Sequence, residues 1–419
     1  MRDRLLTPLF AVLAIAACAR PQRAQDAYAA AVADAIPIVE RTTGLQYKKP
    51  PVYQLRTRAQ IHDFLEKLFN EEKPARDLAE QQTILRRLGV IPDTLDLRRL
   101  ELDLLTEQVV GLYDPHSKTL FIVEGTDPAI MALTVQHELV HALQDQYMNL
   151  DSVENLKGDD DRSLAAASVI EGQATLVTLE AANAAALEMP GMWDRAREAI
   201  RENISSTPVM ARTPRFLQEM LVFPYLSGAE FVHTFQKERP GQMPYNAALP
   251  ASSSQIMHAR EYFGTPRADP ITVRLPAPST GALEYDNVMG EFSTKVILYE
   301  LLKDQRQAAD AAAGWSGDRY ALVKTAQGEG LAWLMLFRSA VDAAEFAQAM
   351  QAFAQVRYPS ATTTKNGVTT TMTAAGRTVT IWGGVVAGHA AVLYQDVPAG
   401  ATGSLFDLAK VRLDQRGSE

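Results

Sequence analysis

The stretch 137–141 reads His-Glu-Leu-Val-His, and residues 171–175 read Glu-Gly-Gln-Ala-Thr. In an α-helix, residues four positions apart lie on one face about one turn apart. His137 and His141 can therefore present two imidazole nitrogens to the same point, which is the spacing of a zinc site. Glu138 lies about 100° further round such a helix, where its carboxylate can act as a general base on a metal-bound water.

The residues around this motif predict a buried helix. Asp127 is a good N-cap, Pro128 suits the first helical position, and residues 129–150 contain neither Gly nor Pro. Apolar side chains surround the motif on almost all sides: Leu133, Val135, Leu139, Val140 and Leu143. The alternative is a core helix with two hydrogen-bonded histidines. A buried His-Glu-His face without a metal would leave polar groups short of partners, so the pattern favours a metal site.

A catalytic zinc usually has three protein ligands and a water, so a third ligand must come from elsewhere in the fold. Glu171 is the candidate, because it interrupts a small, apolar helical run at residues 164–177. It could instead face solvent at the edge of its helix. Asp145 and Glu180 are rival ligands, and Asp145 or Thr175 could also hold an imidazole N–H beside the metal.

These motifs resemble the gluzincin branch of the zincin metallopeptidases over residues 107–180. Thermolysin-like enzymes share the HELxHA core at residues 137–142, and uncharacterised bacterial proteins share the longer HELxHALQDQ helix. The resemblance implies that His137, His141 and Glu171 bind one Zn²⁺ and that Glu138 is the base. Twenty-nine residues separate the second His from the Glu, more than in the best-known gluzincins. We therefore expect a long loop at residues 151–162.

Residues 108–113 and 118–123 predict two strands joined by a tight turn. In zincins, an edge strand before the metal helix binds the substrate as an added strand, and this hairpin occupies the matching place. The resemblance therefore implies an extended peptide or protein as substrate. His116 lies in the turn and is interpreted as a solvated turn residue.

A zincin also uses a donor, often Tyr or His, to stabilise the oxyanion of the tetrahedral intermediate. His258, at the end of a Pro-rich stretch, is the first candidate and Tyr225 the second. We interpret His233 as a packed or capping residue, and His62 and His389 show no partner in the sequence.

The N-terminal residues indicate where in the cell the protein is located. Arg2 and Arg4 precede an apolar run at 5–17, and residues 15–18 resemble a bacterial lipobox ending in Cys18. Lipidation of Cys18 would anchor the chain to the membrane, and we expect an outer-membrane lipoprotein that faces the periplasm. The alternative is an ordinary cleaved signal peptide. Because this is the only cysteine, a lipidated chain would have no thiol left for a disulfide.

Composition narrows the class of protein. The 419 residues are 47% hydrophobic and carry a net charge of −9. A chain of this length can bury a substantial core, and the acidic balance argues against nucleic-acid binding. We predict an α+β fold in which a mainly helical zincin-like domain contains a small N-terminal sheet ending in an edge hairpin. A C-terminal α+β module follows. The expected divisions are 1–18 (signal peptide), 19–48 (tether and first helix), 49–313 (metallopeptidase) and 314–419 (C-terminal module).

Within the second half of the chain, residues 240–278 read as a Pro-rich loop and residues 290–313 as a helix. The C-terminal module should contain five strands and one helix, with Gly376 and the Gly383–Gly384 pair in turns. Its Trp residues are interpreted as core. The expected strands are 318–327, 330–338, 369–375, 377–383 and 385–394, and the expected helix is 342–357.

Together these features predict a lipid-anchored, zinc-dependent peptidase of the bacterial cell envelope. Two alternatives remain open. The chain could be a non-catalytic lipoprotein or a peptide-binding chaperone in which zinc stabilises the fold. It could also be a zinc amidase that acts on a non-protein envelope substrate.

Overall fold

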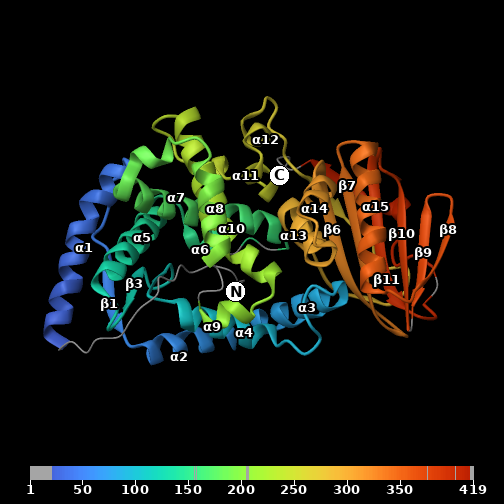
Figure 1. The fold of residues 1–419 in the computed structure, drawn as a ribbon, viewed down its shortest axis with the longest axis horizontal. Helices are drawn as coiled ribbons and strands as arrows, with labels where there is room; N and C mark the ends of the chain where they lie inside the picture. The colour runs from blue at the N-terminus through green and yellow to red at the C-terminus, as the bar shows by residue number, and fades with distance from the viewer. Residues whose placement is uncertain are drawn as a thin grey trace. The chain divides into compact units, whose positions relative to one another are not determined.

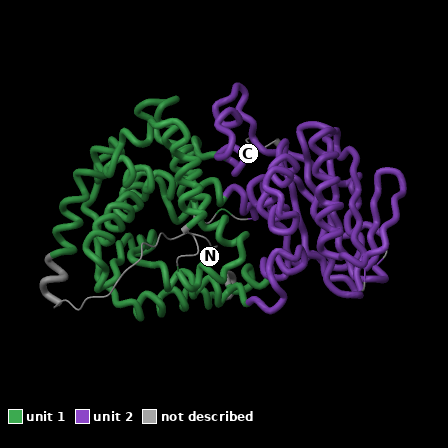
Figure 2. The backbone as a smooth tube through the Cα atoms, viewed as in Figure 1, with its two compact units in different colours: residues 1–79, 96–156, 163–250 green, residues 80–95, 157–162, 251–419 purple. Residues whose placement is uncertain are grey.

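The computed structural model describes residues 21–154, 156, 158–203, 207–374, 376–401 and 403–415. The chain forms two compact units, coloured separately in Figure 2. The first unit comprises 1–79, 96–156 and 163–250, and the second comprises 80–95, 157–162 and 251–419. Helices and sheets occur in both, which confirms the predicted α+β class (Figure 1). The lipobox and Cys18 lie outside the described residues.

The first unit is mainly helical. Its elements, some of which begin or end in the second unit, are α1 (Pro21–Thr43), β1 (Val52–Arg56), α2 (Arg58–Phe69), α3 (Glu72–Leu88), α4 (Leu97–Gln108), β2 (Gly111–Asp114), β3 (Thr119–Val123), α5 (Pro128–Tyr147), α6 (Leu150–Glu154), α7 (Asp160–Leu187), α8 (Met192–Asn203), α9 (Pro208–Arg212), α10 (Arg215–Glu238) and the 3₁₀ turn η1 (Asn246–Ala248).

Its sheet has three strands in the order β1-β3-β2, with β1 parallel and β2 antiparallel to β3. The predicted hairpin is therefore present, and β2 is at the end of the sheet. Asp114 closes the turn, because its carboxylate accepts hydrogen bonds from the His116 and Ser117 amides at 3.1 and 3.3 Å. His116 also places Nε2 3.1 Å from Asp151 Oδ1, so it has a protein contact besides solvent.

The motif helix α5 begins as predicted. Asp127 caps it by accepting hydrogen bonds from the amides of Ala129 and Ile130. One side of α5 packs on α1 and β3, and its core residues include Val135, Leu139 and Leu143. The helix ends at Tyr147 rather than at residue 150.

The segment 151–162 is not the continuous loop that we predicted. Asn149 Oδ1 accepts a hydrogen bond from the Ser152 amide, and Asp145 Oδ1 accepts one from the Leu150 amide. These two side chains stabilise the start of a short helix, α6, within the expected loop. The next long helix, α7, then begins at Asp160.

The second unit is built on a seven-stranded antiparallel sheet in the order β5-β6-β7-β11-β10-β9-β8. Helix α15 packs on β7, β10 and β11. Its elements are α11 (Ser253–Met257), α12 (Ala259–Phe263), β4 (Ile271–Arg274), β5 (Ala282–Asn287), α13 (Gly290–Leu302), α14 (Gln305–Ala312), β6 (Trp315–Thr325), β7 (Gly328–Phe337), α15 (Ala340–Arg357), β8 (Thr362–Asn366), β9 (Thr369–Ala374), β10 (Arg377–Val386), β11 (His389–Pro398), η2 (Leu408–Lys410) and β12 (Arg412–Gln415).

Three sequence predictions for this region were wrong in detail. The stretch 240–278 contains α11, α12 and β4, which are too short to give a clear periodic signal. The expected helix 290–313 is two helices, because Lys303 is left-handed with φ 57° and Asp304 caps α14.

Gly376 lies in a turn as predicted, but Gly383 and Gly384 lie inside β10 and pair with β11. The turn falls instead at Ala387 and Gly388, both with positive φ. The Trp382 ring occupies the space that a side chain at Gly384 would need. A glycine at 384 therefore lets an aromatic ring lie across the strand.

Asp318 organises the interior of the second unit. Its carboxylate accepts hydrogen bonds from the Met289 and Gly290 amides, at 2.9 and 3.0 Å, and so holds the start of α13. The indole N–H groups of Trp315 and Trp333 donate to it at 2.9 Å each. Both rings are about 1% exposed, which confirms their predicted place in the core. No helix in the described ranges is both long and apolar enough to cross a membrane.

Candidate metal centre

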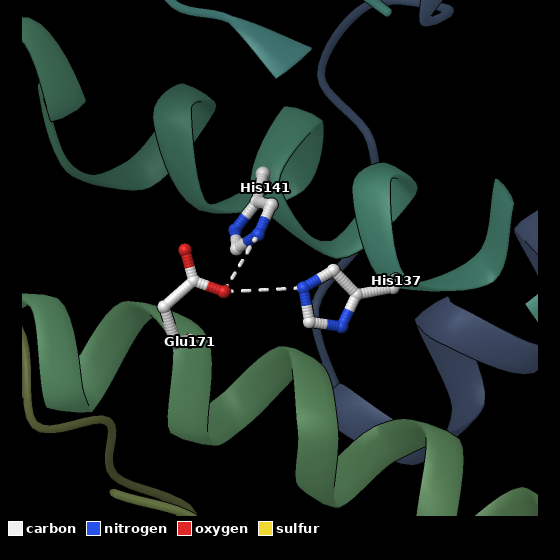
Figure 3. Close-up of side chains that lie close together, drawn as sticks. All are labelled: His137, His141 and Glu171. Atoms are coloured by element: carbon white, nitrogen blue, oxygen red, sulfur yellow. Dashed lines mark hydrogen bonds and ion pairs between the residues drawn. The ribbon is translucent and has the colours of Figure 1, made fainter. Parts of the chain in front are cut away.

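Two helices bring three of the predicted site residues together. His137 and His141 project from adjacent turns of α5, and Glu171 projects toward them from α7 (Figure 3). Glu171 Oε2 lies 3.2 Å from His137 Nε2 and 3.5 Å from His141 Nε2. All three residues are buried, and one ligand atom from each lies within 4.8 Å of the others. The group could therefore hold a metal ion.

The spacing of these atoms suits a tetrahedral zinc site. With zinc–ligand bonds of about 2.0–2.1 Å, two ligands of a tetrahedron lie about 3.3 Å apart. The two Nε2–Oε2 distances in the structure, 3.2 and 3.5 Å, lie on either side of that value. Two imidazoles and one carboxylate also form a donor set typical of catalytic zinc.

The charges of the three groups are coupled. Burial by itself would raise the pKa of Glu171, but the nearby imidazoles outweigh it and lower that pKa below its usual range. Burial would lower the pKa of His141, yet the Glu171 carboxylate raises it to about 9. Protons therefore compete with a metal for the same nitrogens.

Glu138 lies beside this cluster and is held by the sheet. The Tyr113 amide in β2 donates to Glu138 Oε2 at 2.8 Å. Gly111, two residues before Tyr113, lets α5 lie close to β2, since a Cβ there would lie 2.9 Å from Thr134 Cγ2. Burial raises the pKa of Glu138, while the imidazoles act in the opposite direction. Strand β2 therefore positions the predicted base directly.

Close packing of α7 on α10 brings Tyr225 to the cluster. The two helices cross at Gly172 and Gly228, where a Cβ on Gly172 would lie 2.6 Å from the Ala229 nitrogen. Tyr225 is one turn away from this crossing, and its ring stacks on His137 with centroids 6.1 Å apart. Burial and the nearby carboxylates raise the pKa of Tyr225 well above 10, so its hydroxyl stays protonated.

Gln144 was missed by the sequence analysis. His141 Nδ1 lies 2.9 Å from Gln144 Oε1, a contact for which we had considered Asp145. Asp145 instead accepts hydrogen bonds from the Tyr113 hydroxyl and Lys118 Nζ, both at 2.7 Å, so it ties the helix to the hairpin. The signal was present in the sequence, because a residue three positions after His141 can also face its ring.

Among the described residues, Thr175, Glu180 and His233 form no hydrogen bond or ion pair with the three ligands. Thr175 is buried, and its hydroxyl has no hydrogen-bond partner among the residues that the structure describes. Glu180 is about two and a half turns beyond Glu171 on α7. His233, interpreted as a packed residue, contacts Glu188 at 3.1 Å, and its ring lies 5.8 Å from the Trp193 ring at a tilt of 54°.

His258 belongs to the second unit, whereas the three ligands belong to the first. His258 Nε2 lies 2.7 Å from Glu291 Oε1, a contact that raises the pKa of His258. Together with Glu261 it forms another group of possible metal ligands. The Glu261 carboxylate, however, accepts hydrogen bonds from the Arg338 guanidinium and from Ser254. The role of His258 as an oxyanion donor stays a prediction.

The arrangement is that of an HExxH helix completed by a Glu from a second helix. Comparisons with known proteins add little to it. A family described as a domain of unknown function (DUF8575) matches residues 280–393, from β5 into β11 of the second unit. No curated protein matches the chain.

One similar solved structure is that of "a putative hydrolase with a novel fold" from Chloroflexus aurantiacus, at 21% identity and a TM-score of 0.37. The match covers 59% of this chain and 90% of that one. A similarity this low carries no argument about function, so the interpretation depends on the geometry of the site.

Proposed function

We propose that this protein is a zinc-dependent peptidase. The observation that carries the proposal is the position of Glu138 between the three ligands and the outer strand β2. A structural zinc site would not need an additional buried carboxylate fixed beside it. A hydrolytic site does need one, since a base must accept a proton from the attacking water.

When bound, a zinc ion would lower the pKa of a water and polarise a carbonyl group of the substrate. The Tyr113 amide fixes one oxygen of Glu138, and the other oxygen would take the proton and later transfer it to the leaving amine. The protonated hydroxyl of Tyr225, which lies over His137, is suited to donate a hydrogen bond to a developing oxyanion.

The substrate in this proposal is an extended peptide. Strand β2 ends the three-stranded sheet, and it runs directly past Glu138. A peptide that pairs with the outer side of β2 would place one of its carbonyl groups near the base.

The test is Glu138→Gln, assayed on an unfolded, fluorescently labelled protein. The amide cannot accept a proton as a base, so we expect activity to fall by about 10²- to 10⁴-fold while zinc binding is retained. Unchanged activity would contradict the proposal. Parallel assays on peptidoglycan fragments distinguish a peptidase from an envelope amidase, because only an amidase would cleave the amide bond between sugar and peptide.

We further propose that the protein acts in the cell envelope as a lipoprotein anchored through Cys18, probed by Cys18→Ser. We expect the unmodified protein to incorporate labelled palmitate and to fractionate with the outer membrane. The variant should do neither. Equal fractionation of both forms would contradict lipid anchoring.

A further inference from the structure

The amide of Gln144 links both ligand-bearing helices at the metal centre. Its side chain is fully buried on α5, three residues after His141. Gln144 Oε1 lies 2.9 Å from His141 Nδ1. Gln144 Nε2 donates to the Ile170 carbonyl of α7 at 3.0 Å, and Ile170 directly precedes Glu171. Gln144 therefore contacts one ligand and the immediate neighbour of another.

The orientation of this amide is determined by its partners. A main-chain carbonyl can only accept hydrogen bonds, so the NH₂ group of Gln144 must face Ile170. Its oxygen must then face His141, and the ring nitrogen opposite it must carry the hydrogen. His141 is thereby held with hydrogen on Nδ1, so Nε2, which faces Glu171, is the nitrogen available to a metal.

Gln173 and Tyr245 extend this network. Gln144 Nε2 also donates to Gln173 Oε1 at 2.8 Å, and the Tyr245 hydroxyl donates to the same oxygen. Gln173 follows Glu171 by two residues, and its own Nε2 donates to Met243 Sδ at 3.3 Å. Gln144, Gln173 and Tyr245 are buried, so each hydrogen bond lost among them would leave a polar atom without a partner. The chain of contacts thus makes rotation of the Gln144 amide costly.

We propose that Gln144 is the positioning residue of the metal centre: it fixes the tautomer of His141 and, with Gln173, the separation of His141 from Glu171. The inference rests on the proposed zinc binding and names two residues that raise the zinc affinity of the site. Partners that orient ligating imidazoles contribute about 10- to 100-fold to metal affinity. Gln144 and Gln173 would thus position the metal ligands from the same two helices that carry those ligands.

The test compares zinc affinity, by competition with a chelator, for wild type, Gln144→Leu and Gln136→Leu. Gln136 is a matched control, because it is also buried on α5 and donates to a carbonyl of α7, that of Val177, at 3.2 Å. It does not contact Glu171 or His141 in the described structure. We expect Gln144→Leu to weaken zinc binding by about 10- to 100-fold and Gln136→Leu to leave it within about threefold.

Two further measurements separate positioning from a general loss of structure. Gln144→Glu keeps an acceptor for His141, so its zinc affinity should exceed that of Gln144→Leu. In long-range ¹H–¹⁵N spectra of the zinc-loaded wild type, His141 should show hydrogen on Nδ1 and metal on Nε2. Hydrogen on Nε2 would overturn the inference.

Adding Gln173→Leu to Gln144→Leu should cost much less affinity than Gln173→Leu alone, since Gln173 acts through Gln144. Equal zinc affinity in wild type and Gln144→Leu would overturn the inference while leaving the proposed zinc site intact. If the wild type binds no zinc, the inference and the proposed function both fail.

Discussion

The crossing of α7 and α10 at Gly172 leads to a prediction about both stability and metal binding. In Gly172→Ala, the new Cβ would lie 2.6 Å from the Ala229 nitrogen and nearer still to the Gly228 carbonyl. Ordinary contact begins at 3.4 Å, so the helices must separate by about 1 Å, because backbone atoms cannot rotate away. Overpacking of this kind costs about 1–3 kcal/mol of unfolding free energy.

The same displacement should affect the metal centre, since Glu171 adjoins the substituted residue. A shift of about 1 Å moves its carboxylate relative to His137 and Tyr225 and can cost about 10²-fold in activity. The assays are urea unfolding, zinc competition and peptidase activity on purified wild type and Gly172→Ala. Gly383→Ala is the control, because a Cβ at Gly383 meets no atom within 4 Å. Wild-type stability and zinc affinity in Gly172→Ala would refute this reasoning.

Substitutions at three other positions give separate tests. Asp318→Ala leaves four buried donors without an acceptor, so urea unfolding should show that the free energy of unfolding falls by more than about 4 kcal/mol. Asp318→Asn keeps an acceptor oxygen and should lose less. Equal losses in the two variants would contradict this. Burial raises the pKa of Asp161 from 3.8 to about 8, so its protonated form is favoured in the folded state and stability should fall as pH rises from about 4 to 8. Asp161→Asn should therefore gain stability relative to wild type as pH rises from about 4 to 8. Parallel pH profiles would contradict this. Tyr225→Phe keeps the ring on His137 but removes the hydroxyl, so kcat should fall about 100-fold while the zinc content stays unchanged. An unaltered kcat would exclude Tyr225 as the oxyanion donor.

The sequence contained enough information to predict the core of the site. Helix periodicity placed His137 and His141 on one face, and the N-cap at Asp127 located the start of the helix. Glu171 was identifiable because a carboxylate within a small, apolar helix requires a partner. The hairpin also followed from its turn residues. Each of these predictions depends on local pattern, which a single sequence records well.

What could not be predicted depends on contacts between distant segments. Asp145 and Gln144 were both plausible partners of an imidazole, and the choice follows from the positions of α7 and the hairpin. The Gln144 amide donates a hydrogen bond to the Ile170 carbonyl of α7. Asp145 instead accepts hydrogen bonds from Tyr113 in β2 and from Lys118, directly before β3. The Gly383–Gly384 pair was read as a turn because local propensity cannot show that the Trp382 ring covers Gly384.

Zinc stoichiometry tests the central claim most directly. The measurement is the metal content of purified wild type, His141→Ala and Glu171→Ala after equilibration with zinc and removal of the excess. Three ligands from two helices predict about one zinc per chain in wild type and a marked loss in both variants. Wild type without zinc, or Glu171→Ala with undiminished zinc, would contradict the three-ligand site.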